Sequence, residues 1–453
     1  MDLRPNSDEA RDIAYHFHGY TDAQKHEDVG PLIIDRGEGC YVFDSHGKRY
    51  IEGMAGLWSV AVGFNEKRLI DVAHEQMKKL PYYHNFAHRS HGPAIDLAEK
   101  LIEIAPVPMS KVFYTNSGSE ANDTIVKMVW YRSNALGKPG KKKIISRMRG
   151  YHGVTVASAS MTGLPNNHRS FDLPLDGILH TTCPHYWREG QEDETEAAFA
   201  TRCAQDLDDM IEAEGPDTVA AFIAEPVMGA GGVVVPPATY WEKIQAVLAK
   251  YDILLIADEV ICGFGRTGNM FGSTTYDIKP DILTMSKQIT SSYFPFSAFM
   301  INNRVYDPIA EESGKIGVLG HGYTAGGHPV GAAVALENIK IIEERDLVTN
   351  AAERGAELQA GLANFADHPL VGEARGVGLI AALELIAPAG RESEFAAGKL
   401  GAQMNAIMLE NALMSRNMLD AVAFCPPLIV TSEQVTEMMN IVHRSLKTLT
   451  SEI

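Results

Sequence analysis

The chain has 453 residues, more than the roughly 250–300 that one hydrophobic core usually serves, so we expect about two domains. Its apolar share of 45% and charged share of 22% are those of an ordinary globular protein in water. The 40 lysines and arginines against 58 aspartates and glutamates give a net charge of −18, which disfavours a nucleic-acid partner.

The five cysteines are odd in number and scattered, without a C-x-x-C pair. They therefore predict neither a disulfide framework nor a zinc ribbon. The first residues lack the apolar core of a secretory signal, and no stretch is long and apolar enough to cross a bilayer. From this we expect a cytoplasmic protein with no membrane partner.

Along the chain, short strand-like segments come first, at 40–44 and 48–52, and a helical spacing of apolar residues follows over 93–105. Apolar runs then alternate with helical patterns. Strands are predicted at 111–115, 143–146, 219–224, 253–257 and 282–285, and helices at 120–132, 194–214 and 240–250. This alternation predicts a mostly parallel sheet covered by helices on both faces.

Beyond about residue 330 the pattern is rich in helices, with one strand-like stretch near 377–385. We therefore predict an α/β protein with a large domain over residues 71–330. A smaller α+β domain would be formed by residues 331–453 together with the N-terminal segment 1–70.

Polar residues follow the predicted strands directly. The first strand runs into Asn-Ser-Gly-Ser-Glu at 116–120, and later strands end at Glu225, Asp258 and Lys287. In open α/β sheets, ligands bind outside the carboxyl ends of the strands. Any one of these residues could be an ordinary exposed strand end, but the whole set at such ends predicts a ligand site.

The turn at 116–120 opens a helix, and free backbone N–H groups at such a place suit a phosphate. The simpler interpretation is a plain helix start with Ser119 as the N-cap. Lys287, if desolvated, would be a nucleophile toward aldehydes. Asp258 would keep a pyridine nitrogen protonated, so the set matches pyridoxal phosphate.

Several motifs in a fixed order carry a family resemblance. They are Asn-Ser-Gly-Ser-Glu-Ala-Asn-Asp at 116–123, Gly-Tyr-His-Gly at 150–153, Ala-Glu-Pro-Val-Met-Gly-Ala-Gly-Gly at 224–232, Asp-Glu-Val-Ile-Cys-Gly-Phe-Gly-Arg-Thr-Gly at 258–268, Ser-Lys at 286–287 and His-Gly-Tyr-Thr at 321–324. From about Tyr20 to the C-terminal helix the chain resembles the class III, or omega, aminotransferases. With Gly-Leu-Trp-Ser at 56–59 and Cys-Pro-His-Tyr-Trp at 183–187, it looks nearest to bacterial (S)-selective amine–pyruvate transaminases.

The resemblance implies fold type I and pyridoxal 5′-phosphate held as a Schiff base on the catalytic Lys287, which also shuttles the proton. The other residues that it implies for cofactor binding are Gly118 and Ser119 at the phosphate, Tyr151 and Val260 on the two ring faces, Asp258 at the ring nitrogen, Glu225 in support, and Thr324 reaching the phosphate of the neighbouring subunit. Because Thr324 would cross between subunits, the resemblance implies a homodimer, or a dimer of such dimers.

The substrate side is also implied by the resemblance. Its residues would be Tyr20, Trp58, Phe86, Tyr151, Val154, Ala230 and Arg416, the last receiving a substrate carboxylate from a mobile loop at 415–420. The chain departs from the family pattern at Gln288, Ser297, Gly326 and Asp420, which affects the expected shape of the pocket.

The implied activity is a ping-pong transamination from an amine or omega-amino acid to a keto acid such as pyruvate. The alternatives are an aminomutase, racemase or decarboxylase of the same fold, or a protein that binds the cofactor without catalysis. The sequence does not name the physiological amine.

Two further motifs are weaker. Gly263–Gly268 matches G-x-G-x-x-G, but an acidic pair separates it from its strand and no good helix start follows, so a dinucleotide site is disfavoured. His84, His88 and His91 would share one face if they were helical, yet no carboxylate or cysteine accompanies them. We therefore expect no metal site there.

Overall fold

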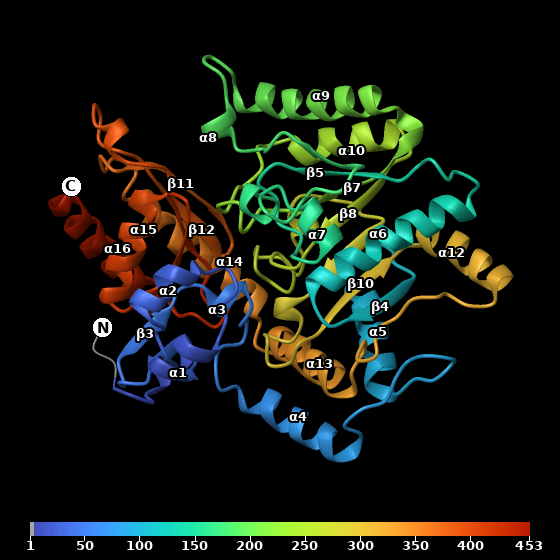
Figure 1. Cartoon of the computed structure of the whole chain (residues 1–453), viewed down its shortest axis with the longest axis horizontal. Coiled ribbons are helices and arrows are strands. Elements are labelled where there is room, and N and C mark those ends of the chain that lie inside the picture. The colour runs from blue at the N-terminus through green and yellow to red at the C-terminus, as the bar shows by residue number, and fades with distance from the viewer. Residues whose placement is uncertain (1–3) are drawn as a thin grey trace.

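The computed structural model describes residues 4–453 and is built around a central seven-stranded sheet (Figure 1). In spatial order its strands are β4 (Lys111–Thr115), β10 (Ser297–Ile301), β9 (Ile282–Met285), β8 (Leu254–Asp258), β7 (Val219–Ala224), β5 (Lys143–Arg147) and β6 (Ile178–Thr181). All five strands predicted for this sheet are present within a residue or so of their expected bounds.

The five strands from β9 to β6 run parallel, whereas β10 is antiparallel to both of its neighbours. The sheet is thus mostly parallel, as expected. Strands β6 and β10 were not predicted from the sequence, because they are short and lie outside the regular alternation of strands and helices. Because β10 joins β4 to β9, it brings the turn after Thr115 to the same edge as Lys287.

Helices cover both faces of the sheet because consecutive apolar residues of a strand point in opposite directions. In β5, Ile144 packs into one core cluster and Ile145 into another. The first face carries α6 (Gly118–Ala135), α7 (Val156–Met161) and α12 (Asn303–Ile316). The second carries α9 (Glu196–Glu214), α10 (Tyr240–Lys250), α5 (Gly92–Glu103) and α13 (Pro329–Glu344), with α4 (Lys67–Lys79) packed on α13.

Two smaller sheets lie beside the central one. One has the order β1 (Ile34–Glu38), β2 (Tyr41–Asp44), β3 (Arg49–Glu52) and β13 (Leu413–Met414). The other has the order β11 (Val371–Val377), β12 (Ile380–Leu385), β15 (Ala421–Phe424) and β14 (Arg416–Met418). The accompanying helices are α1 (Asp8–Tyr15), α2 (Ala23–Val29), α3 (Ala55–Trp58), α14 (Leu347–Ala363), α15 (Lys399–Glu410) and α16 (Ser432–Glu452), and the one-turn helices α8 (Tyr186–Glu189) and α11 (Gly272–Thr275) complete the set.

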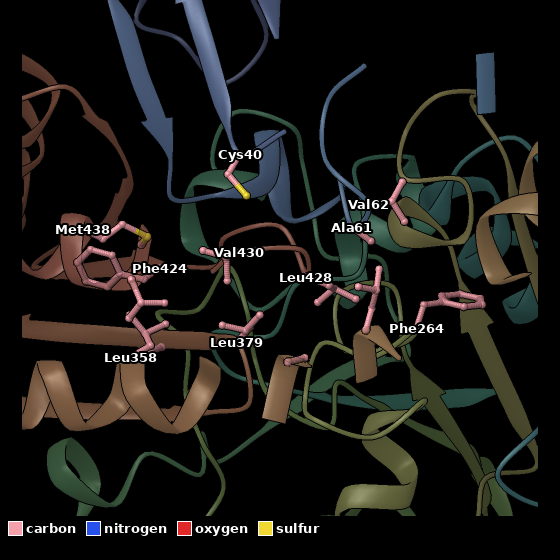
Figure 2. Packing of buried hydrophobic residues seen from close by; sticks show 14 of the residues in the cluster. Cys40, Ala61, Val62, Phe264, Leu358, Leu379, Phe424, Leu428, Val430 and Met438 are labelled. Carbon is pink, nitrogen blue, oxygen red and sulfur yellow. The ribbon is translucent and has the colours of Figure 1, made fainter. Parts of the chain in front are cut away.

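The N-terminal and C-terminal parts of the chain meet in one of these sheets and in a shared core. Strand β13 pairs in parallel with β3, placing Leu413 beside Ile51. Figure 2 shows Cys40, Phe424 and Val430 within the same buried cluster. We therefore propose that residues 1–70 and 331–453 form one smaller domain, as the sequence suggested.

Two sequence expectations for this region are wrong. The single strand expected near 377–385 is a hairpin of two strands, β11 and β12, which turn at Gly378 with a φ of +53°. The mobile loop expected at 415–420 is largely a second hairpin, in which Arg416 pairs with Ala423. Such short strands leave too few residues for a periodicity to be recognised.

Candidate active site

Most of the expected cofactor residues line one cavity at the carboxyl ends of the central strands. They are Gly118, Ser119, Tyr151, Glu225, Asp258, Val260 and Lys287, joined by Asn122, His152, Gly153, Ile261 and Ser286. The one residue expected for the cofactor that does not line this cavity is Thr324.

One end of the cavity is the N-terminus of α6. The side chain of Ser117 caps this helix by accepting from the backbone N–H of Glu120, at 3.2 Å. The N-cap is thus Ser117, and the expectation of Ser119 is wrong because the helix begins earlier, at Gly118. Within residues 4–453, the backbone N–H groups of Gly118 and Ser119 have no protein acceptor. These free donors at the positive end of a helix dipole suit a phosphate.

The segment after Tyr151 closes over this helix end. The backbone N–H of Val154 donates to Ser119 Oγ at 3.1 Å. At Gly153, with a φ of +131°, an added Cβ would lie 2.6 Å from Ser119 Oγ and 2.5 Å from Ser158 Oγ. Only glycine permits the backbone to approach Ser119 this closely, so the segment after Tyr151 holds the Ser119 side chain in place.

Asp258, the last residue of β8, is buried and receives three hydrogen bonds. His152 Nδ1 and Asn122 Nδ2 lie 2.8 and 3.0 Å from Oδ2, and the backbone N–H of Val260 lies 3.1 Å from Oδ1. Burial alone would raise the pKa of Asp258, but His152 and the other donors outweigh burial and lower it. A carboxylate that stays ionised can hold a proton on a neighbouring ring nitrogen.

His152 and Asn122 are further functional candidates, which were not predicted from the sequence. Both stand inside recognised motifs, at 150–153 and 116–123, but nothing in those motifs indicates that they meet Asp258. His152 is 2% exposed and its Nε2 has no hydrogen-bond partner within residues 4–453. Its Nδ1 therefore orients the Asp258 carboxylate from inside the protein.

Lys287 lies two residues beyond the end of β9 and begins a 3₁₀ turn, Lys287–Ile289. Its φ of +46° lies in the left-handed region, which is strained for a side chain of this kind and typical of functional positions. Within residues 4–453, no hydrogen bond or ion pair holds its ammonium group. Burial lowers the pKa of Lys287, and the opposing effect of Asp258 and Glu225 does not cancel this.

Glu225 positions Tyr151 rather than facing the cavity with a free carboxylate. Its Oε1 accepts from the backbone N–H of Tyr151 at 3.0 Å, and its Oε2 accepts from that of Gly229 at 2.9 Å. Burial raises the pKa of Glu225. Burial and the neighbouring Tyr20 raise the pKa of Tyr151 as well, so the phenol stays protonated at neutral pH.

Arg416, Trp58 and Tyr20 gather beside this cavity. The Arg416 guanidinium lies over the Trp58 ring, 5.2 Å from its centroid. Burial lowers the pKa of Arg416, while Tyr20 and Tyr151 act in the opposite direction. The Tyr20 hydroxyl accepts a hydrogen bond from the Asn167 side chain. The structure therefore brings these three substrate candidates together.

Ala230 lies in the turn that follows Glu225, between the bridged residues Met228 and Val234. This turn packs in the same cluster as Trp58, through Val227 and Val233. The position of Ala230 is therefore consistent with a place near the substrate pocket.

Phe86 and Thr324 lie elsewhere, at a second hollow. Phe86 lines this hollow together with Tyr114, His321 and Gly322. Thr324 is exposed two residues further along, and its carbonyl accepts from the Tyr82 hydroxyl at 2.8 Å. Neither residue lines the cavity around Lys287 within one chain.

The four departures from the family pattern are each accommodated locally. Gln288 is fully buried, donates to the carbonyls of Ile261 and Gly263 and accepts from Arg266. Asp420 accepts from the backbone N–H groups of Gly398 and Gly401 at the start of α15.

The other two departures lie near the β4 edge. The Ser297 hydroxyl donates to the carbonyl of Met285, which joins β10 to β9. At Gly326 an added Cβ would lie 2.8 Å from the carbonyl oxygen of Tyr114. A serine at Gly326 would therefore force this turn to shift.

The weaker motifs adopt other structures. Gly263–Gly268 forms a turn before the one-turn helix α11 and starts no long helix, so the dinucleotide context is absent there. His84 and His88 lie outside any helix, while His91 caps α5 and its Nε2 lies 2.8 Å from the carbonyl oxygen of Gly327. The three histidines thus do not share a helix face.

Comparisons with known proteins agree on one family. The model of the family described as Aminotransferase class-III matches residues 22–446. The chain belongs to the class-III aminotransferases. A crystallised omega transaminase from Pseudomonas jessenii, in complex with PMP, is 60% identical over 99% of both chains with a TM-score of 0.97.

Other relatives point to the same activity. A mitochondrial gamma aminobutyrate transaminase 1 from Solanum lycopersicum is 50% identical over 430 residues, which cover 94% of this chain and 84% of the relative. A structure described as a transaminase with L-ala is 66% identical, covers 93% of this chain and all of that one, and has a TM-score of 0.91.

The aminotransferase therefore has fold type I and depends on pyridoxal phosphate, as the sequence indicated. The residues present fit this cofactor. The free N–H groups on α6 suit its phosphate, the ionised Asp258 suits its ring nitrogen, and the unpaired Lys287 suits its aldehyde. No helix within residues 4–453 is long and apolar enough to cross a membrane.

Proposed function

We propose that this aminotransferase moves an amino group from an amine or omega-amino acid to pyruvate, in a ping-pong cycle with Lys287 as the catalytic residue. The observation that carries the proposal is the pairing of the Lys287–Asp258 cavity with an arginine over an aromatic ring at its side. Membership of an aminotransferase family favours transamination over the aminomutase, racemase, decarboxylase and non-catalytic alternatives.

When bound, pyridoxal phosphate supplies an aldehyde that takes up the amino group and a ring that withdraws electrons from the substrate carbon. Gly118 and Ser119 would bind its phosphate, and Tyr151 and Val260 would flank its ring. Asp258, positioned by His152 and Asn122, would hold the proton on the ring nitrogen. Lys287 has a lowered pKa, so its Nζ is suited to accept and return the substrate proton.

Arg416 and Trp58 would allow the pocket to accept two types of substrate, a keto acid and an apolar amine. A keto acid carries a carboxylate that pairs with a guanidinium, while an apolar amine gives a buried charge no partner. In this structure Arg416 rests on the Trp58 ring, so its charge keeps a favourable contact when no carboxylate is present. We propose that the side chain moves from this ring to the carboxylate of the keto acid, with Tyr20, Val154 and Ala230 completing the pocket.

Similar proteins support this substrate class. A Pseudomonas jessenii variant that is 59% identical, with changes at a tryptophan, a phenylalanine and an arginine, was engineered for asymmetric synthesis of enantiopure bulky amines. These residue types match Trp58, Phe86 and Arg416. The L-ala in another neighbour is the compound that pyruvate becomes when it gains an amino group. Selectivity for (S)-amines is part of the same proposal.

We also propose a homodimer, or a dimer of dimers, in which each subunit completes the other's site. Phe86 and Thr324 are exposed in one chain and lie away from its own cavity. A partner cavity facing this hollow would use both residues. A cytoplasmic location is proposed too, and five free, buried cysteines fit a reducing compartment.

A panel of donors with pyruvate tests the substrate proposal. The donors would be 1-phenylethylamine as both enantiomers, β-alanine, 4-aminobutyrate and putrescine, with alanine formation as the readout and 2-oxoglutarate as the alternative acceptor. We expect alanine from the (S)-amine and from at least one omega-amino acid. Activity with 2-oxoglutarate alone, or no alanine from any donor, would contradict pyruvate as the acceptor.

A further inference from the structure

Three histidines surround one carboxylate in the N-terminal segment, outside the lining of the cofactor cavity. Asp12 lies in α1, and its Oδ1 is 3.0 Å from His16 Nδ1. Its Oδ2 is 2.8 Å from His18 Nε2 and 3.0 Å from His26 Nε2. His26 lies in α2, so the cluster joins the two helices that flank Tyr20 (Figure 1).

The three imidazole rings lie close to one another around this carboxylate. The centroid of His18 lies 4.1 Å from that of His16 and 4.3 Å from that of His26. The ligating atoms of Asp12, His16 and His18 all lie within 4.8 Å of one another. Within residues 4–453, no lysine or arginine forms an ion pair with Asp12. Asp12, His16 and His18 therefore offer one carboxylate and two imidazole nitrogens to a common centre, while His26 hydrogen-bonds to the same carboxylate.

We propose that Asp12, His16 and His18 bind one divalent transition-metal ion of the zinc type, with His26 orienting the Asp12 carboxylate. Two imidazoles and one carboxylate fill three positions of a tetrahedral zinc site, and a water molecule can fill the fourth. Calcium and magnesium prefer sites made of oxygens, so this donor set does not suit them. Every cysteine of the chain is buried elsewhere, so no exposed thiolate competes for the ion.

The geometry needs only a small adjustment to accept the ion. Bonds of about 2.0–2.2 Å in a tetrahedron separate the ligand atoms by roughly 3.3–3.5 Å. The observed separations from the Asp12 oxygens are 2.8–3.0 Å, so the rings move apart slightly as the ion enters. His26 and Asp12 are mostly buried, at 13% and 15% side-chain exposure, while His16 is 65% exposed and free to adjust.

The ion would hold the Asp12 carboxylate, which also accepts from His26 of α2. It would thereby steady the contact between α1 and α2 on either side of Tyr20, whose hydroxyl contacts Asn167. The segment that carries Tyr20 would then be held at both ends. The metal site itself does not rest on the proposed substrates.

The test uses the tag-free holoenzyme, treated with a chelator, dialysed and titrated with ZnCl₂ in a calorimeter. We expect one zinc per chain, a higher melting temperature with zinc and no binding of MgCl₂. In the variant with His16→Gln and His18→Gln, each glutamine amide still donates to Asp12 but ligates zinc poorly. Its affinity for zinc should fall by at least about 10- to 100-fold, the loss seen even for outer-shell partners.

The control is His74→Gln on α4, an exposed histidine outside the cluster, which should bind zinc like the original protein. Melting without zinc shows whether the double variant is folded, and His16→Asn on the exposed ring gives a second test if it is not. Absence of stoichiometric zinc binding, or unchanged affinity in a folded cluster variant, would overturn the proposal.

Discussion

The cavity around Lys287 and the hollow beside Phe86 differ in how their walls are held. The cavity stands on the ends of β7, β8 and β9, and Asp258 within it is 3% exposed with three hydrogen-bond donors. Phe86 is 44% exposed on an irregular segment, and the facing residues 317–326 belong to another irregular segment. The groups around Lys287 are thus fixed within one chain, whereas the second region presents side chains outward.

This difference suggests a division of roles. Residues that must hold charge at fixed positions are desolvated and supported by the sheet, which makes their electrostatic effect large. Residues that shape the entrance are exposed in a single chain and would become part of a site only by contact with a partner. Substitutions in the cavity should therefore have the larger effects, and those at the Phe86 hollow should act across subunits.

The largest effect is expected for Asp258→Asn. The phosphate and lysine contacts remain, so cofactor binding should persist, but the ring nitrogen loses its anionic partner. Removing one such preorganised contact costs about 3–4 kcal/mol, or roughly 10²–10³ in rate. Single-turnover kinetics with the cofactor content measured in parallel would check this. Turnover near that of the original enzyme would contradict the role of Asp258.

Arg416→Ala should show a smaller and substrate-dependent loss. A charge-assisted hydrogen bond contributes about 1.5–3 kcal/mol, so kcat/KM with pyruvate should fall roughly 10- to 100-fold. The half-reaction with an amine that lacks a carboxylate should change much less. Single-turnover measurement of each half-reaction separates the two. Equal losses in both, or none in either, would remove Arg416 from the carboxylate site.

Phe86→Ala should raise KM for an aromatic amine by about 2- to 12-fold, because an aromatic pair contributes roughly 0.5–1.5 kcal/mol. Hybrid dimers with an excess of Lys287→Ala chains show which site Phe86 serves. All activity then comes from sites with an intact lysine, in the Phe86→Ala chains. A KM restored to the original value means that Phe86 acts across the interface, whereas an unchanged high KM would place it in its own subunit's site.

The smallest effect is expected on the stability of the apoenzyme in Lys287→Met. Because burial lowers the pKa of Lys287 in the folded state, the unfolded chain binds more protons, and stability rises with pH up to the unfolded value of about 10.4. Methionine removes this penalty, so unfolding at pH 7 should cost about 1 kcal/mol more. The gain should shrink toward pH 10.

Denaturant titrations at pH 7 and near pH 10 measure this difference. The matched control is Lys279→Met, because Lys279 is 67% exposed and forms only a surface ion pair with Asp277. Its effect should stay within about 0.5 kcal/mol. A loss of stability in Lys287→Met at pH 7 would show that the buried ammonium is better compensated than the structure indicates.

The strand ends could be predicted from the sequence because each places a polar residue directly after an apolar run, as at Asp258. What the sequence could not supply was which distant residues meet. His152 contacts Asp258 across 106 positions, and no local pattern encodes that contact. The helix cap was misplaced at Ser119 because serines occur on both sides of Gly118 and either could begin the helix.

Short strands that depend on pairing with another strand were the second feature that could not be predicted from the sequence. Arg416 lies in β14, a strand of only three residues that pairs with β15. Because this strand depends on that pairing, the sequence of the segment looks like that of a loop. Phe86 was grouped with the pocket residues from the family resemblance, yet one chain leaves it at a separate hollow. Positions that depend on pairing or on a partner are set by long-range contacts, which sequence periodicity does not report.

We propose that Lys287 binds the cofactor covalently, and reduction followed by peptide mapping would locate this bond. The holoenzyme would be treated with borohydride, digested and analysed by mass spectrometry for the reduced cofactor adduct. We expect one adduct per chain, on the peptide that contains Lys287. An adduct on another lysine, such as the exposed Lys279, with Lys287 unmodified, would contradict it.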